Sequence, residues 1–226
     1  WLLASNNKIA SIDLTNNTEL EEISLTRNLL TSIDLSKNIK LLDLSLEDNQ
    51  LTSVDLTNNT LLTDLNVAGN DIHALNLNHL SKLQRIYING NGMTAPELNE
   101  FYYTLPQRVD DGSGDENLND GTRADSSIAV DREWKPSHQG TNGGCEWAYL
   151  DIVNPLHGTV KVVDAEGNEY TNGSKVTKYL PLTIIATPDA GYAYSSYSLN
   201  NDEAVGNNNF EMPGIYTKLR VSFIKD

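Results

Sequence analysis

Leu20-Glu-Glu-Ile-Ser-Leu-Thr-Arg-Asn28 is the first full copy of a phrase that decides the fold. The same pattern of three apolar positions and a closing asparagine returns every 21 residues, starting at Leu41, Leu62 and Leu83. A second apolar phrase with this period starts at Leu30, Leu51 and Ile72. A fixed short period is the signature of a repeat array in which each coil packs on its neighbours. We therefore expect a solenoid whose coils each bury two apolar segments.

The coil itself can be read from the phrase. The alternating apolar positions before each asparagine predict a short parallel strand with its leucines inward. The asparagine is expected to turn the chain, because its amide can satisfy backbone groups that the turn leaves unpaired. One ladder comprises Asn7, Asn28, Asn49, Asn70 and Asn91, and another comprises Asn17, Asn38 and Asn59 and ends at Leu80. We assign both ladders a structural role, and we assign the sequons at 16–18 and 58–60 to the repeat itself.

Composition excludes several classes of protein. The formal net charge of -15 over 226 residues argues against binding of nucleic acid or of an anionic membrane surface. No apolar run reaches the roughly 20 residues of a membrane span. A single cysteine, Cys145, excludes an intramolecular disulfide and gives no pair of metal ligands.

The period fails after Met93, where a helix is expected. Thr94 and Glu97 have capping-box spacing, and Pro106 ends the segment. The apolar stripe of this helix can close the exposed end of the array, and it consists of Leu98, Phe101, Tyr102 and Leu105.

Two acidic features of the sequence, a ladder of carboxylates and the stretch 110–120, could each bind a cation. Stacked carboxylates on the convex side could attract calcium, or they could accept hydrogen bonds from neighbours such as Ser32 and Ser53. This ladder comprises Asp13, Asp34, Asp55 and Asn76. The acidic stretch 110–120 has alternating oxygen ligands but no glutamate at the last ligand position of a calcium loop. We expect a mobile, solvated loop there in preference to a calcium loop, and we assign no metal site.

A change of composition near Cys145 predicts a second domain. Short β-runs at 160–163, 182–187, 192–199 and 216–224 are separated by turn residues, which is typical of a small all-β domain. We therefore expect a repeat domain at 1–145, with repeats over about 1–93 and a cap at 94–145, and a β-rich domain at 146–226.

These motifs resemble known surface proteins. The 21-residue period and the phrase Leu51 to Thr60 are similar to the leucine-rich repeats of internalin-like and BspA-like bacterial surface proteins. Where some relatives carry a cysteine in the strand, this chain has Leu25, Leu46, Val67 and Ile88. Residues 156–225 resemble the divergent internalin B-repeat, through phrases such as Ala186-Thr-Pro-Asp-Ala-Gly-Tyr192. The resemblance implies a leucine-rich repeat solenoid with a helical cap, followed by a β-grasp-like domain that has no catalytic residues.

The strand face is the expected binding surface, because outward side chains of adjacent strands form a continuous surface. Five rungs about 4.8 Å apart and roughly 10 Å wide offer on the order of 250 Å², whereas a standard interface takes about 800 Å² from each partner. Tight protein binding would therefore need additional surface. The candidate residues are Glu22, Ser24, Asp43, Ser45, Glu47, Asp64, Asn66, Arg85, Tyr87 and Asn89.

No catalytic motif is present in the sequence. His73, His79, His138 and His157 are scattered, and no phosphate loop or nucleophile elbow occurs. We also expect the strand face to offer no pocket that would raise a carboxyl pKa. The sequence thus predicts no cofactor and no enzyme.

Three functions remain at this stage. We expect a non-enzymatic extracellular or cell-surface protein that adheres to a host protein or glycan. The alternatives are a structural spacer that presents another module and, third, a glycan-processing enzyme. Leu2, Ala4 and Asn7 are already in register, so we expect a leader or anchor to lie outside this sequence. The ligand and the oligomeric state are left open.

Overall fold

The computed structural model of the chain describes residues 1–107, 116–117, 127–132, 134, 147–200, 202–204, 208–213 and 215–225. The chain forms two compact units, Trp1–Gly144 and Cys145–Asp226. Among the described residues, no helix has both the length and the apolar character that a membrane crossing requires.

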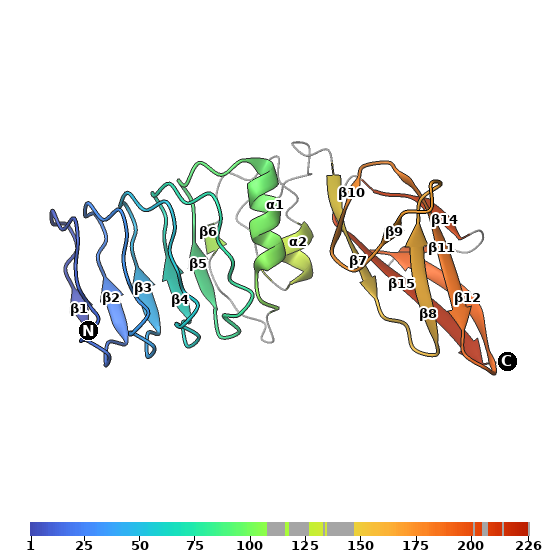
Figure 1. The fold of residues 1–226 in the computed structure, drawn as a ribbon, viewed down its shortest axis with the longest axis horizontal. Coiled ribbons are helices and arrows are strands. Elements are labelled where there is room, and N and C mark those ends of the chain that lie inside the picture. The colour runs from blue at the N-terminus through green and yellow to red at the C-terminus, as the bar shows by residue number, and fades with distance from the viewer. Residues whose placement is uncertain are drawn as a thin grey trace. The chain divides into compact units, whose positions relative to one another are not determined.

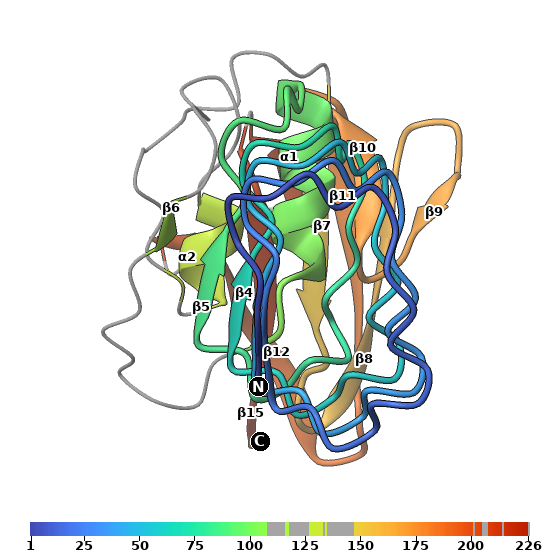
Figure 2. The ribbon, with the colours of Figure 1, turned by 90° about the vertical axis from the view of Figure 1, so that its left-hand side faces the viewer.

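The first unit is a parallel β-solenoid (Figure 1). Each coil adds one short strand to a single sheet, and neighbouring strands pair in parallel with a shift of one period, as Ile23 with Leu44 and Leu44 with Leu65. Seen from the β1 end, the backbones of successive coils lie over one another (Figure 2). The strands are β1 (Leu2–Leu3), β2 (Glu22–Ser24), β3 (Asp43–Ser45), β4 (Asp64–Asn66), β5 (Arg85–Tyr87) and β6 (Glu116–Asn117).

The core of the solenoid is the pair of apolar phrases. The central strand residues Ile23, Leu44, Leu65 and Ile86 are at most 1% exposed. Fully burying one such side chain contributes about 1.5–3 kcal/mol, so the repeated stripe supplies most of the driving force. The second phrase is buried as well, through Leu30, Leu35, Leu51, Leu56, Ile72 and Leu77. The predicted inward positions are thus confirmed for these residues, whereas Ile33 and Val54 of the second phrase are only half-buried.

The first asparagine ladder joins each coil to the preceding one. The Asn49 side-chain amide donates to the carbonyl oxygens of Leu46 and Leu25, both at 3.0 Å. Its Oδ1 accepts the N–H of Leu30 at 3.0 Å. Asn28, Asn70 and Asn91 repeat this pattern one period apart. Buried backbone groups are therefore satisfied by the asparagines, as expected from the sequence.

The second ladder is buried at Asn38 and Asn59, whereas Asn17 in the first coil is exposed. Asn38 donates to the carbonyl oxygens of Leu14 and Asn17, and Asn59 donates to those of Leu35 and Asn38, at 2.9–3.2 Å. Both asparagines are 0% exposed. Asn38 and Asn59 thus bond the backbone between coils, which confirms the structural role of these two asparagines.

A column of left-handed residues runs along the array one position before the first ladder. Arg27 has φ 56° and Asp48 has φ 52°. In the next two coils the same position is a glycine, Gly69 with φ 63° and Gly90 with φ 73°. The N–H of each donates to the next coil where one follows, as Arg27 does to the carbonyl of Glu47 at 2.8 Å. The turn therefore requires positive φ in every coil, whatever residue the sequence supplies.

Helix α1 (Ala95–Thr104) begins where the period fails. Glu97 Oε2 accepts hydrogen bonds from the Thr94 backbone N–H at 2.6 Å and from its hydroxyl at 2.7 Å. The Thr104 hydroxyl donates to the Leu75 carbonyl at 3.1 Å, which ties the helix to the last coil. The expected apolar stripe is buried, and it comprises Leu98, Phe101, Tyr102 and Leu105.

The acidic stretch 110–120 was expected to be a loop, and at residues 116–117 this prediction is wrong. Glu116–Asn117 form β6, which pairs in parallel with β5 through Ile86 and Tyr87. Such pairing satisfies backbone groups that an open edge of β5 would leave unpaired. The remainder of the stretch, Cys145 and His138 lie outside the described residues. A short helix, α2 (Ser127–Asp131), packs against α1.

The second unit is built from strands, as predicted. A five-stranded sheet has the order β10-β7-β15-β12-β13, and a four-stranded sheet has the order β14-β11-β8-β9. All pairs are antiparallel except β15 with β7. The bounds are β7 (Trp147–Val153), β8 (Gly158–Val163), β9 (Glu169–Tyr170), β10 (Ser174–Thr177), β11 (Pro181–Pro188), β12 (Tyr192–Leu199), β13 (Asp202–Ala204), β14 (Asn209–Glu211) and β15 (Thr217–Lys225).

One apolar core joins the two sheets of this unit. Leu150 of β7 and Leu219 of β15 bury their side chains with Val162 of β8 and Ile184 of β11. Each of these strands contributes alternate residues to the core, as a strand with one buried face requires. Among the described residues of this unit there is no helix, and the finer β-grasp assignment stays a prediction.

Candidate functional site

The outward side chains of β2 to β5, with the residue two places after each strand, form a surface that we call the strand face. The parallel register brings the ten candidate residues together with Thr26 and Ala68 in three rows of four. The rows are Glu22, Asp43, Asp64 and Arg85, then Ser24, Ser45, Asn66 and Tyr87, then Thr26, Glu47, Ala68 and Asn89. Their arrangement follows from the 21-residue period, and their role in binding stays a prediction.

Arg85 is not a free cation. Its Nε donates to Asp64 Oδ1, and the Thr63 hydroxyl donates to Asp64 Oδ2 at 2.7 Å. This carboxylate raises the pKa of Arg85. An exposed ion pair contributes only about 0–1 kcal/mol, so a ligand group could still compete for either partner.

Asp43 is a carboxylate of the strand face on which burial and like-charged neighbours outweigh the opposite charge of Arg85. Partial burial raises the pKa of its carboxyl, and the neighbouring charges of Asp64 and Glu22 raise it further. No hydrogen bond or ion pair joins this carboxylate to any residue that the structure describes. This raised pKa was not expected from the sequence, and the expectation that the strand face has no pocket stays a prediction. The largest cause of the raised pKa is partial burial, and the one-period register adds to it because it stacks three like charges on adjacent strands.

The polar side chains of the two other rows bond to each other along diagonals. Ser45 Oγ lies 2.8 Å from Thr26 Oγ1, and Asn66 donates to Glu47 Oε2 at 3.2 Å. Ser24 Oγ pairs in the same way with Ser5 Oγ at 2.8 Å. These groups are thus partly satisfied before any ligand arrives.

The last rung breaks this diagonal pattern. Tyr87 and Ala68 occupy the positions of the next diagonal pair, and an alanine offers no polar partner. Within the described residues, the Tyr87 hydroxyl makes no hydrogen bond. Its half-buried ring is therefore the aromatic group that a ligand could stack on.

The convex carboxylates are occupied by local hydrogen bonds. Asp13 Oδ1 accepts from the Thr15 backbone N–H at 3.0 Å and from its hydroxyl at 2.6 Å, and these bonds lower the pKa of Asp13. Asp34 and Asp55 accept the N–H two residues ahead in the same way. The predicted partners Ser32 and Ser53 were wrong, because an aspartate turn bonds forward along its own chain. Within the described ranges, no three His, Cys, Asp or Glu side chains are grouped to hold a metal ion.

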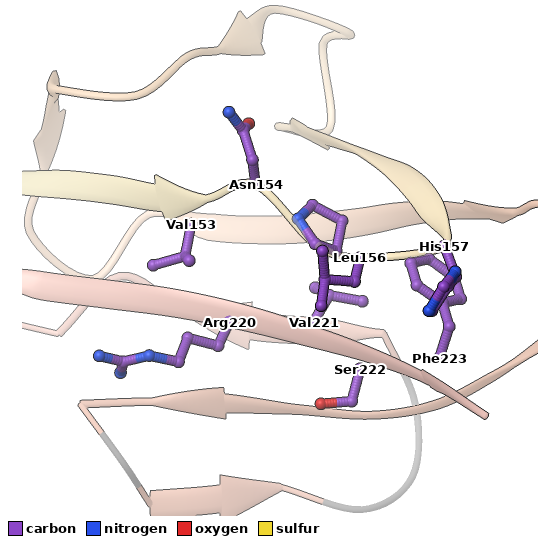
Figure 3. Close-up of a pocket in the computed structure, with 9 residues that line it drawn as sticks. Val153, Asn154, Leu156, His157, Arg220, Val221, Ser222 and Phe223 are labelled. Carbon is purple, nitrogen blue, oxygen red and sulfur yellow. The ribbon is translucent and has the colours of Figure 1, made fainter.

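The structure adds a pocket that the sequence did not indicate. A hollow of about 340 Å³ lies in the second unit between the loop after β7 and the end of β15 (Figure 3). Residues 153–157 and 220–223 line it. Its walls come from segments far apart in the chain, and only the turn residues Asn154 and Pro155 could have suggested a loop here.

Comparison with known proteins finds a likeness for most of the second unit. Residues 149–225 match the family model of the divergent InlB B-repeat domain. This agrees with the expected B-repeat but starts earlier than residue 156, because β7 is an integral strand of the sheet. No curated protein matches the chain.

One solved structure is also similar. It is the functional domain of InlJ from Listeria monocytogenes, which includes a cysteine ladder. The identity is 16% and the TM-score 0.40, and the match covers 99% of this chain and 61% of that chain. This chain therefore spans less than two thirds of the length of that structure.

Proposed function

We propose that this chain belongs to an extracellular or surface-attached bacterial protein that binds a host protein or glycan through the strand face. In this proposal the solenoid is a leucine-rich repeat array of the internalin-like type, α1 is its cap, and the second unit is an accessory module with a β-grasp-like fold. The match of residues 149–225 to the divergent InlB B-repeat supports a setting among surface proteins.

The observation that carries the proposal is the chemistry of the strand face. A partly buried and unpaired carboxylate, Asp43, lies one strand from the Asp64–Arg85 pair. Tyr87 adds a half-buried aromatic ring beside Arg85 on β5. Such a face favours many modest contacts, because its area of about 250 Å² is below that of a standard interface.

Binding of the purified chain to a panel of mucin glycans and matrix proteins, measured by interferometry, tests this function. We expect saturable binding that Tyr87→Ala and Asp43→Asn each weaken about tenfold, as loss of one central contact does. Asp55→Asn on the convex side is the matched control and should bind as the parent does. Binding that all three variants leave unchanged would remove the strand face from the account.

A spacer function is the second candidate, because the diagonal hydrogen bonds of the strand face also stiffen the array. In a spacer these bonds would serve rigidity alone, and no ligand would bind the strand face. The same panel separates the two functions, since a spacer gives no saturable signal that maps to this chain.

We propose no enzymatic activity. Asp43 is the carboxyl whose raised pKa would suit an acid catalyst, and it lies on an exposed strand face. Turnover of a glycan substrate that disappears in Asp43→Asn, while binding persists, would contradict this part of the proposal.

A further inference from the structure

The strand β15 extends beyond the end of its neighbour β7. Against β12 it is paired up to Lys225, whereas against β7 the register ends where Arg220 meets Val153. Beyond that point β7 has left the sheet. Residues 221–225 therefore have no strand on their β7 side among the described residues, and their backbone groups on this side form an open edge.

The pocket of the second unit lies along this open edge. Residues 153–157 form one wall and residues 220–223 of β15 form the other, with about 340 Å³ between them (Figure 3). A ligand pocket starts at about 300 Å³, so the hollow can accept two or three residues of an extended chain. No bond among the described backbone hydrogen bonds outside the strands reaches residues 221–225.

The far wall of the pocket is held in place. The imidazole of His157 stacks on the ring of Tyr192, with centroids 4.0 Å apart and planes at 6°. The His157 carbonyl accepts the N–H of Asp189 at 3.0 Å. A Cβ on Gly158 would meet the Phe223 ring at 2.5 Å, so only glycine allows this close approach. The loop is thus positioned before any partner arrives, which reduces the entropic cost of binding.

The walls also have a distinct chemistry. Val153, Pro155, Leu156 and Phe223 are apolar, and Leu156 is 80% exposed. The ionisable side chains of the lining are Arg220 and His157, and no carboxylate is among the lining residues. In a chain of net charge -15, this pocket is a local exception, and an acidic side chain of a partner would share Arg220 with the interaction that it already makes.

We propose that the pocket binds an extended segment of another polypeptide, which adds as a strand along residues 221–225 of β15. An apolar side chain of the segment packs against Leu156 and Phe223, and an acidic side chain lies toward Arg220. Backbone pairing supplies affinity in this mode of recognition, and side-chain pockets supply selectivity. The site is in the second unit and does not depend on ligand binding by the strand face.

The test uses the whole chain and a fluorescein-labelled heptapeptide in which valine alternates with threonine and one threonine is replaced by glutamate. A second peptide carries N-methyl groups on alternate amides and cannot pair. Titration followed by amide NMR should shift residues 154–157 and 221–225 with the first peptide and not with the second. Hydrogen exchange of alternate amides in 221–225 should slow when the first peptide is bound.

Variants locate the site. Leu156→Asp should weaken peptide binding about tenfold or more, because it removes the apolar contact and repels the acidic residue. Ile185→Asp is the matched control, since Ile185 is an exposed apolar residue on the outer face of β11. Glutamate-to-lysine exchange in the peptide should also weaken binding.

Several results would overturn the proposal. One is equal binding of the N-methylated peptide, which would indicate a hydrophobic pocket for small molecules. Another is the absence of peptide-dependent shifts at millimolar concentration. Protection of the same amides that grows with protein concentration alone would assign the edge to a second copy of this chain instead.

Discussion

His79 Nε2 lies 3.1 Å from the carbonyl oxygen of Leu56. In the two preceding coils the equivalent carbonyls, those of Leu14 and Leu35, accept from the buried amides of Asn38 and Asn59. The next position of that ladder is Leu80, whose side chain has no donor. The imidazole one residue earlier therefore replaces the missing asparagine. A carbonyl only accepts, so Nε2 carries the hydrogen.

Removal of this imidazole should destabilise the last coil. We expect His79→Ala to lower the free energy of unfolding by about 1 kcal/mol, the usual net contribution of one hydrogen bond. His79→Gln retains a side-chain N–H and should recover part of the loss. Urea denaturation followed by circular dichroism measures both, and equal stability of His79→Ala and the parent would contradict this role.

Substitution in the first asparagine ladder should lower stability more than His79→Ala does. Asn49→Ala leaves the Leu30 N–H and the Leu25 and Leu46 carbonyls without this partner in a buried site. We expect a loss of about 3 kcal/mol, since each buried unsatisfied group costs roughly 1–3 kcal/mol. The control is Asn58→Ala, at an exposed asparagine of the same repeat, which should change stability little. Urea midpoints of the two variants give the comparison.

A substitution at Gly69 tests whether the column of residues with positive φ contributes to stability. The φ of Gly69 is 63°, and a Cβ added here would overlap Asp48 Oδ1. We expect Gly69→Ala to cost about 1–2 kcal/mol for the left-handed backbone, with a further loss because Asp48 must move. Gly167→Ala is a suitable control, because it has positive φ as well but no atom within 4 Å of the added Cβ. If thermal unfolding showed equal losses, the contact with Asp48 would have no effect.

The repeat alone was enough to predict the solenoid. Period, inward residues and asparagine ladders all express one rule, that a coil stacks on a copy of itself. The rows of the strand face followed for the same reason, because residues 21 positions apart must lie on adjacent strands. This is why the sequence alone predicts that Asp43 and Asp64 lie on one surface.

What escaped sequence reasoning depends on contacts that carry no period. The raised pKa of Asp43 depends on its depth and on charges of two other coils. β6 pairs across a gap of about thirty residues, and a two-residue polar strand has no pattern. The open edge of β15 arises because β7 is the shorter strand, which only the register between the two can reveal.

His73 should make stability depend on pH near neutrality. A hydrogen bond to Glu97 at 3.2 Å, with a weaker one to Asp71, raises the pKa of His73 above its ordinary value of 6.5. The folded state therefore holds this proton more tightly, and the stabilisation is full below the ordinary value and is lost as pH rises through the raised one. We expect His73→Ala to lower the thermal midpoint at about pH 5.5 and to have little effect at about pH 8.5. An effect of equal size at both pH values would show that charge has no part in this contact between the last coil and α1.

Asp43→Asn should stabilise the protein at neutral pH. The pKa of this carboxyl is raised by burial and by Asp64 and Glu22, so the folded state favours its protonated form. Its contribution is therefore favourable below the ordinary value of 3.8 and is lost as pH rises through the raised pKa. We expect a gain of less than about 1 kcal/mol at pH 7 and none at about pH 3, as for other partly exposed charges.

Asp34→Asn is the control of opposite sign for this prediction. Hydrogen bonds from Ser36 lower the pKa of Asp34, so its carboxylate stabilises the folded state above the ordinary value of 3.8. The amide variant should be equal to the parent or slightly less stable at neutral pH. Urea titrations at the two pH values decide between the signs. Asp43→Asn could prove more stable than the parent and yet bind more weakly on the interferometer. The charge of Asp43 would then cost folding stability while contributing to ligand binding. A stable variant with undiminished binding would mean that the stacked carboxylates are only a consequence of the repeat.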